Sequence, residues 1–326
     1  MQGETKGGNA SVKAIARALA ATWARVVEAL VVVWLLASLV FFALRLLPGD
    51  PAALVLGDDA SPAELARVRA SLHLDLPLGE QYLRFLRGLA TLDLGESLRR
   101  PGVSAMARVV DSLGPTSALA AAAVALGAVV GIGAALLAAG PWLRPRSRAW
   151  IDRALVSTSA MPLLAFAPVL TYALAARARL VPLPGDPDAG LTGLLFASAL
   201  LSVPLAAHAG RVGRAALGDL GRAPFLVVAR AKGASNLRVW LRHALPVASG
   251  PIVTVVATQL GALLGGAVVL ERLFERAGLG TLILEAYASR DLPVLEGAVV
   301  AAGALFVASP AIAAAVHAAI DPRVRA

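Results

Sequence analysis

The sequence predicts an all-α polytopic membrane protein with six transmembrane helices. Of its 326 residues, 58% are hydrophobic and only 16% are charged, and the mean hydropathy is +0.74. Soluble domains are typically about half apolar and about a quarter charged. Six separate segments are also long and apolar enough to cross the roughly 30 Å hydrocarbon core as helices.

The predicted spans follow a short basic N-terminal segment, residues 1–25. They cover residues 26–47, 112–139, 154–176, 191–210, 247–270 and 294–320. The basic residues before the first span are similar to the start of a signal peptide. However, the apolar run is long and no small-residue cleavage site follows it, so we expect the span to be retained.

Basic residues are distributed unevenly between alternate loops. Residues 140–153 contain four arginines and 211–246 are strongly basic, whereas seven arginines in residues 48–111 face nine acidic residues. Basic loops of membrane proteins face the cytoplasm. We therefore expect residues 1–25 and the tail 321–326 in the cytoplasm. The same bias explains the net charge of +9 without nucleic acid as a partner.

The long outer loop, residues 48–111, is predicted to contain two short amphipathic helices. Ser61 is a candidate N-cap, Pro62 is suited to the first helical position, and Glu64 completes a capping box. The face of this helix comprises Leu65, Val68 and Leu72, and that of the second helix Tyr82, Phe85, Leu86 and Leu89. These helices lie on the outer membrane face or on the spans. A passive folded loop and a docking platform both remain open.

Residue patterns of catalysis and of ion coupling are absent from the sequence. It has no cysteine, no nucleophile or zinc motif, no phosphate-binding loop, and its histidines (His73, His208, His243 and His317) are scattered. Charges lie at span ends, as Glu28, Arg45 and Glu296 do, whereas ion-coupled transporters hold ionisable groups within the membrane. An enzyme, a metal site and a stand-alone secondary transporter or channel are therefore disfavoured, and the energy source is expected in another protein.

The segment ARAKGASNLRVWLRHALP, residues 229–246, is predicted to form two short helices. Gly233 suits a left-handed helix cap, and Ser235 or Asn236 caps the second helix. The apolar side of that helix comprises Leu237, Trp240, Leu241 and Ala244, and Pro246 marks the transition into the fifth span. A solvated basic loop needs the charges but not this pattern, so we interpret the segment as a protein-docking element.

The same segment resembles the EAA motif of ABC importer permeases, E-A-A-x3-G-x9-I-x-L-P. Ala229, Gly233, Leu245 and Pro246 stand at matching positions, while Val227, Val228 and His243 replace the Glu, first Ala and Ile. Stretches 44–52, 92–98, 270–297 and 321–325 resemble, in order, further motifs of the dipeptide/oligopeptide/nickel permease subfamily. Leu92 and Ala277 depart from its usual Gly and Pro.

The resemblance implies the ABC type I importer permease fold, with residues 112–320 as the core, in the bacterial cytoplasmic membrane. It implies a homologous second permease, distinct or identical, two cytoplasmic ATPase subunits and an external binding protein. ATP and Mg²⁺ then bind the partner subunits, and no cofactor binds this chain. The implied cargo is a di- or oligopeptide or a related small solute, with a nickel chelate as the alternative.

Two groups of candidate site residues follow. The ATPase-coupling loop comprises Ala229, Arg230, Ala231, Lys232, Gly233, Ser235, Arg238, Trp240, Arg242, His243, Leu245 and Pro246. Candidates for the translocation path are Ser159, Pro162, Thr258 and Gln259; each either lines a hydrated path or serves packing between helices. In the third span Leu164 and Ala165 replace aromatics usual in the subfamily. The pairs Gly127/Gly131 and Gly261/Gly265 are expected to allow close helix packing.

Overall fold

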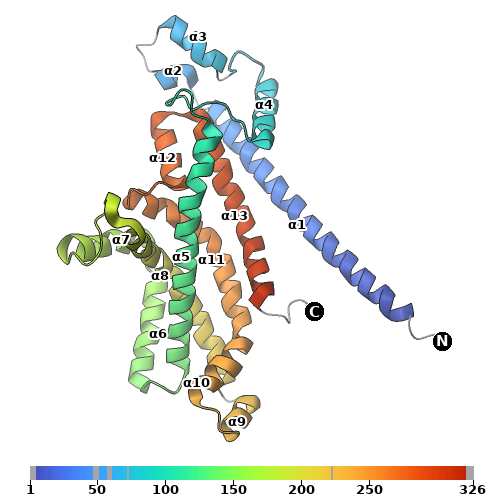
Figure 1. Cartoon of the computed structure of the whole chain (residues 1–326), viewed down its shortest axis with the longest axis vertical. Coiled ribbons are helices and arrows are strands. Elements are labelled where there is room, and N and C mark those ends of the chain that lie inside the picture. The colour runs from blue at the N-terminus through green and yellow to red at the C-terminus, as the bar shows by residue number, and fades with distance from the viewer. Residues whose placement is uncertain (1–4, 47–50, 57–60, 72, 222, 321–326) are drawn as a thin grey trace. The chain divides into compact units, whose positions relative to one another are not determined.

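The computed structural model describes residues 5–46, 51–56, 61–71, 73–221 and 223–320, which are almost entirely helical (Figure 1). Leu72 and the tail 321–326 lie outside the described residues. The α-helices are α1 (Thr5–Leu46), α2 (Pro51–Leu56), α3 (Pro62–Ser71), α4 (Leu78–Thr91), α5 (Ala105–Ala139), α6 (Pro145–Ser159), α7 (Leu163–Thr171), α8 (Gly190–Leu220), α9 (Pro224–Ala231), α10 (Asn236–Val239), α11 (Leu245–Leu273), α12 (Leu279–Ser289) and α13 (Leu292–Ile320). Two π-helical segments, η1 (Tyr172–Arg177) and η3 (Trp240–Ala244), and a 3-10 turn, η2 (Pro187–Ala189), complete the order.

Five helical segments of the described chain are long and apolar enough to cross a membrane. They are Trp23–Leu46, Ala105–Ala139, Pro187–Leu220, Asn236–Leu273 and Leu292–Ala311. The pair α6 and α7 makes a sixth if it is counted as one broken span. The predicted all-helical membrane fold is confirmed.

The third span, predicted for residues 154–176 with helix interruptions at Pro162 and Pro168, breaks at Pro162, whereas Pro168 lies inside α7. Its two halves, α6 and α7, meet at an angle of 108°. The break falls at Ala160–Pro162, and Pro162, the N-cap residue of α7, has an extended backbone (φ −65°, ψ 135°). Proline supplies no N–H to the preceding turn and disfavours helical geometry in the residue before it. The break therefore has a local cause.

The chain divides into two compact units, residues 1–106 with 289–308 and residues 107–288 with 309–326. In the first unit, α4 packs against α1. Phe41 of α1 is fully buried, with its ring centroid 5.3 Å from that of Phe85. The hydroxyl groups of Ser38 and Tyr82 are hydrogen bonded at 2.6 Å. The apolar face predicted for α4 is thus confirmed, and it lies against a span.

The predicted capping box at the start of α3 is confirmed in atomic detail. Both the backbone N–H and the hydroxyl of Ser61 donate to Glu64 Oε2, at 2.9 and 2.7 Å. The Glu64 N–H donates back to Ser61 Oγ at 3.3 Å. The side-chain hydrogen bond from Ser61, followed by its backbone hydrogen bond, lowers the pKa of Glu64 below its usual value.

Residues 95–98 and 290–293, which belong to two of the motif stretches, meet inside the first unit, although they are far apart in the chain. Asp291, at the start of α13, is fully buried. One of its carboxylate oxygens accepts a hydrogen bond from the Ser97 hydroxyl, and the other accepts from the Leu98 N–H at 3.0 Å. The stretches GESL (95–98) and RDLP (290–293) are therefore joined to each other by hydrogen bonds.

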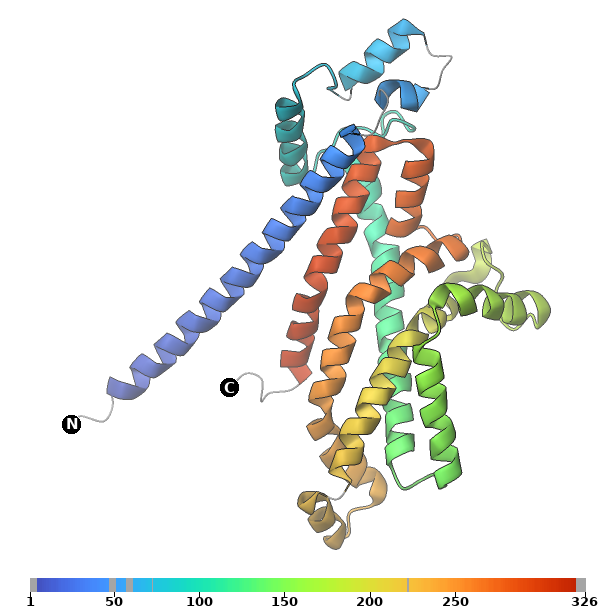
Figure 2. The same ribbon diagram turned by 180° about the vertical axis from the view of Figure 1, so that it is seen from behind.

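In the second unit, α5, α6, α8 and α11 run side by side (Figures 1 and 2). Its main core is formed by Leu119, Ala123, Phe166, Ala167, Phe196, Ala197, Leu200, Leu201, Leu205, Leu263, Ala267, Leu270 and Phe274. Gly127 and Gly131 lie directly against α8, because a Cβ on either would come within about 3 Å of Leu205 or the Ala206 carbonyl. This part of the glycine prediction is confirmed.

The second glycine pair is not used as predicted. A Cβ on Gly265 would meet no atom within 4 Å, whereas one on the neighbouring Gly266 would come within 2.8 Å of Leu201 and 3.0 Å of Leu163. The residue in contact is therefore Gly266. A spacing of four residues defines a helix face but not which face the fold buries.

A buried carboxylate joins three segments of the second unit. Glu271, at the end of α11, is 1% exposed. It accepts hydrogen bonds from the Thr116 hydroxyl (2.6 Å) and from the N–H groups of Gly280 (2.8 Å) and Thr281 (3.3 Å) at the start of α12. Thr116 Oγ1 in turn accepts from the Leu279 N–H at 2.8 Å. Glu271 and Thr116 together cap α12, since the first N–H groups of a helix have no partner within it.

We expect Thr116→Val to lower the stability of the protein by about 1–3 kcal/mol, because it leaves the Leu279 N–H and a Glu271 oxygen without a buried partner. Thr116→Ser keeps the hydroxyl and serves as the control. Thermal unfolding of the purified protein measures both. Equal melting temperatures for the two variants would contradict the capping role.

We expect the start of α3 to become less protected in acid. The folded-state pKa of Glu64 is lowered, so its contribution is present at neutral pH and is lost as the pH falls through that lowered value. Hydrogen–deuterium exchange of the α3 amides, corrected for intrinsic rates, follows this loss. Glu64→Gln, which also forms capping boxes but does not titrate, should show no such pH dependence. The same dependence in both proteins would refute the assignment.

Candidate functional site

The predicted coupling segment forms two short helices joined at a left-handed glycine. Gly233 has φ of +83° and follows α9. Its N–H donates to the Arg230 carbonyl at 2.9 Å, and the Ala234 N–H donates to the Ala229 carbonyl at 3.1 Å. This pair of hydrogen bonds is the Schellman motif, so the predicted cap is confirmed. A Cβ would meet no atom there, and only the backbone conformation favours glycine.

The second helix is capped by Ser235, and not by Asn236. Ser235 Oγ accepts from the Arg238 N–H at 3.4 Å, and its carbonyl accepts from the Val239 N–H at 2.9 Å. Asn236 is the first residue of α10. One of the two alternatives left open by the sequence is thereby selected.

The apolar side predicted for this helix is partly wrong. Trp240 and Ala244 are buried, 3% and 0% exposed, but Leu237 and Leu241 are 58% and 43% exposed. Leu237 and Leu241 lie one turn apart on one line of the helix, and Trp240 and Ala244 lie one turn apart on the neighbouring line. Only the second line faces the core, so the buried stripe is narrower than predicted.

The two helices are anchored by their own small hydrophobic core. It comprises Ala135, Leu217, Leu226, Ala229, Val239, Trp240, Ala244 and Ala248. The ring centroids of Trp142 and Trp240 lie 5.9 Å apart. This core fastens α9 and α10 to the ends of α5 and α8, so the segment is a packed element and not a solvated loop.

Pro246 lies at the transition into the fifth span, as predicted, because it is the second residue of α11, and the helix does not break there. The helical segment Asn236–Leu273 is continuous through it, from α10 through η3 into α11. Proline at an inner helix position removes one hydrogen bond. The π-helical turn immediately before Pro246 changes the hydrogen-bonding register there, and the rod from α10 into the fifth span remains unbroken.

The outward face of this element combines apolar and basic side chains, and we call it the α9–α10 surface. Its exposed apolar members are Phe225, Val227, Val228, Leu237 and Leu241. Its exposed basic members are Arg230, Lys232, Arg238 and Arg242. Ala231 and Pro246 are also exposed, and His243 and Leu245 are half-buried. A cluster of exposed apolar residues with a charged rim is typical of a protein interface.

Two of the path candidates share the break between α6 and α7. The Ser159 hydroxyl accepts a hydrogen bond from Arg211 Nη1 of α8 at 2.9 Å, and Pro162 is the N-cap residue of α7. Thr258 and Gln259 lie on α11, where the Thr258 hydroxyl donates to the Val255 carbonyl of its own helix. The sequence prediction missed Arg211 because it lies one residue beyond the predicted fourth span.

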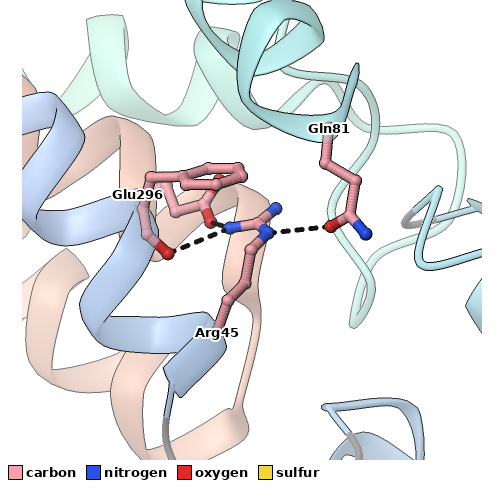
Figure 3. A network of polar contacts seen from close by, with 4 residues as sticks. Arg45, Gln81 and Glu296 are labelled. Atoms are coloured by element: carbon pink, nitrogen blue, oxygen red, sulfur yellow. Dashed lines mark hydrogen bonds and ion pairs between the residues drawn. The ribbon is translucent and has the colours of Figure 1, made fainter. Parts of the chain in front are cut away.

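The charges at the ends of the first and last spans are paired with each other (Figure 3). Arg45 Nη1 lies 2.5 Å from Glu296 Oε1, and Arg45 Nε donates to Gln81 Oε1 at 3.1 Å. The guanidinium also lies 3.7 Å from the centroid of the Phe41 ring. This network joins α1, α4 and α13 within the first unit. In the sequence both charges lie at span ends, but nothing there indicates that they meet.

These features define a class of protein: a helical membrane protein with a packed two-helix element whose exposed face is apolar and basic. Comparison with known families gives the particular family. Residues 105–326 match the binding-protein-dependent transport system inner membrane component, and residues 19–100 match the N-terminal membrane component of such systems. The chain belongs to the family of binding-protein-dependent transport system inner membrane components. It is the permease subunit of an ABC importer, in which a binding protein and a separate ATPase are its partners.

Similar proteins cover almost the whole chain. A probable peptide ABC transporter permease of Sinorhizobium fredii is 30% identical over 92% of this chain and 97% of its own length. A putative peptide transport system permease of Brucella abortus is 33% identical over the same shares. A glutathione transport system permease of Salmonella paratyphi A is 34% identical over 89% of this chain and 94% of its own length.

We expect Gly233→Val to loosen the junction between α9 and α10, because a left-handed backbone costs an ordinary residue about 1–2 kcal/mol and a β-branched one more. Gly233→Asn, which tolerates this conformation, should behave almost as the wild type. Amide exchange across residues 224–246 measures the effect. Gly218→Ala in α8, where a Cβ meets no atom within 4 Å, is a matched control. Equal exchange in the Val and Asn variants would contradict the cap.

Proposed function

We propose that this chain forms one half of an ATP-driven import channel for di- or oligopeptides or a related small solute delivered by an external binding protein. Its relatives named as peptide and glutathione permeases support this class of cargo. A homologous permease, distinct or identical, supplies the other half. The observation that carries the proposal is the α9–α10 surface, an apolar and basic docking face fastened to a membrane-spanning rod.

The docking face engages the ATPase subunits, two per importer, on the cytoplasmic side. Its exposed leucines, Leu237 and Leu241, enter an apolar cleft, and the surrounding basic residues face acidic groups at its rim. Burial of apolar side chains supplies affinity, while rim charges mainly set orientation and association rate. ATP and Mg²⁺ bind the ATPase subunits, and this chain holds no cofactor of its own.

The continuous helix Asn236–Leu273 transmits the movement. Because α10 is its first segment, a displacement of the docking face by closure of the ATPase subunits moves α11 as well. Rigid-body motion of packed helices is a common way of switching between two states. The break at Pro162 and the side chains of Ser159, Thr258 and Gln259 are the part of the chain that we assign to the path.

The proposal is tested by replacing the exposed leucines. Leu237→Gln/Leu241→Gln puts two amides into an apolar cleft, and each buried amide without a partner costs about 1–3 kcal/mol. We expect ATP-dependent uptake to fall by about tenfold or more. The assay uses proteoliposomes with the full importer and labelled dipeptide, glutathione and a nickel chelate as alternative cargoes.

Leu237→Met/Leu241→Met keeps an apolar surface and is the matched control, expected to retain uptake. Copurification of the ATPase subunits shows whether the loss arises from docking. Unchanged uptake in the Gln variant would show that the α9–α10 surface does not couple to the ATPase. Uptake of the nickel chelate alone would reject the peptide assignment but not the docking role.

A further inference from the structure

A polar cavity of about 820 Å³ lies within the first unit, near the C-terminal end of α1. It is lined by α4, the segment that follows it, the end of α1 and the start of α13. Cavities of about 300–1,000 Å³ are typical of sites for small ligands. The permease function described above does not use this cavity.

Its depth along the first span follows from contacts of α4. Tyr82 is hydrogen bonded to Ser38, eight residues before the end of the membrane-crossing segment Trp23–Leu46. With a rise of about 1.5 Å per residue, Ser38 lies about 12 Å inside that end. On α4, the helix that carries Tyr82, the side chain of Leu83 is 65% exposed. Part of α4 therefore lies beside the hydrocarbon, and the cavity, which includes Leu44 and Arg45, lies where the apolar stretch of α1 ends.

Of the arginines that line the cavity, two have guanidinium groups that are available to bind a ligand. Arg45 is engaged by Glu296 and Gln81, and the Asp93 carboxylate accepts from the Gly95 N–H at 3.1 Å. Arg84 and Arg87 are exposed, lie about one turn apart on α4 and line the cavity. Within the described part of the chain, neither has an ion-pair partner. Two adjacent arginines are a strong donor set for phosphate oxygens.

We propose that this cavity binds the phosphate-bearing headgroup of an anionic phospholipid, from the leaflet on the side of residues 48–111. Phospholipid phosphates lie just outside the hydrocarbon, which is the depth of the cavity. The exposed Leu83 lies one turn before Arg87 on the same side of α4, outside the cavity lining, and supplies an apolar surface for an acyl chain. Free phosphate shares the headgroup chemistry but does not contact such a surface, so the two sources are distinguishable.

The experiment measures retention of phosphatidylglycerol by the purified full importer, by native mass spectrometry over a lipid titration. Each arginine near a lipid surface contributes about 1 kcal/mol, so Arg84→Gln/Arg87→Gln should weaken retention about thirtyfold. Arg67→Gln/Arg100→Gln removes the same charge from exposed positions of the same loop outside the cavity and should retain lipid as the wild type does. Equal loss in both double variants would overturn the site.

Further arms separate the sources of phosphate. Millimolar inorganic phosphate should not displace the lipid; displacement would show an anion site and overturn the lipid assignment. Equal retention of phosphatidylcholine would also overturn it. A photoactivatable phosphatidylglycerol should crosslink to residues 78–95 of the wild-type protein, which tests the site even if the double variant assembles poorly. Crosslinks confined to other segments would count against the proposal.

Discussion

Backbone N–H and C=O groups inside a bilayer have no water to bond with, so each must find a partner within the protein. This requirement explains why the described chain is helical almost throughout. It also explains how the prolines are accommodated. Pro168, Pro204 and Pro251 lie inside helices, and a π-helical segment follows the first of these closely. Among the described residues, a span breaks and changes direction only at Pro162, where the backbone is extended.

Helix ends raise the same problem, because their terminal N–H groups have no partner inside the helix. Glu271 caps the start of α12. Asp291 lies at the start of α13, and its carboxylate accepts a hydrogen bond from the Ser97 hydroxyl. Both carboxylates are buried, and each connects residues more than 150 positions apart through its partner, Thr116 or Ser97. Buried charges of this kind are tolerated because hydrogen bonds satisfy them. They explain why short polar motifs recur in an otherwise apolar sequence.

The features that were predicted correctly are those set by neighbouring residues. The Ser61–Glu64 capping box, the left-handed Gly233 and the apolar face of α4 each depend on a few consecutive positions, and each is present. Features that depend on tertiary packing were missed or wrong. Nothing in the spacing of Leu237, Trp240, Leu241 and Ala244 shows which of these four side chains the fold buries. In the same way, proline spacing did not distinguish the break at Pro162 from the tolerated Pro168, and Arg45 gave no sign of its pairing with Glu296.

The long helix from Asn236 to Leu273 has a mechanical consequence. At about 1.5 Å per residue its 38 residues span about 57 Å, with the docking face at one end and the Glu271 clamp at the other. A stiff lever of this length converts a small tilt at its base into a displacement of several ångströms at its tip. The hydrogen-bonding register changes at the π-helical turn, and Pro251 lies inside the same helix. How much of a stroke applied at the base reaches the far end therefore depends on the bending stiffness of the whole helix, these two places included.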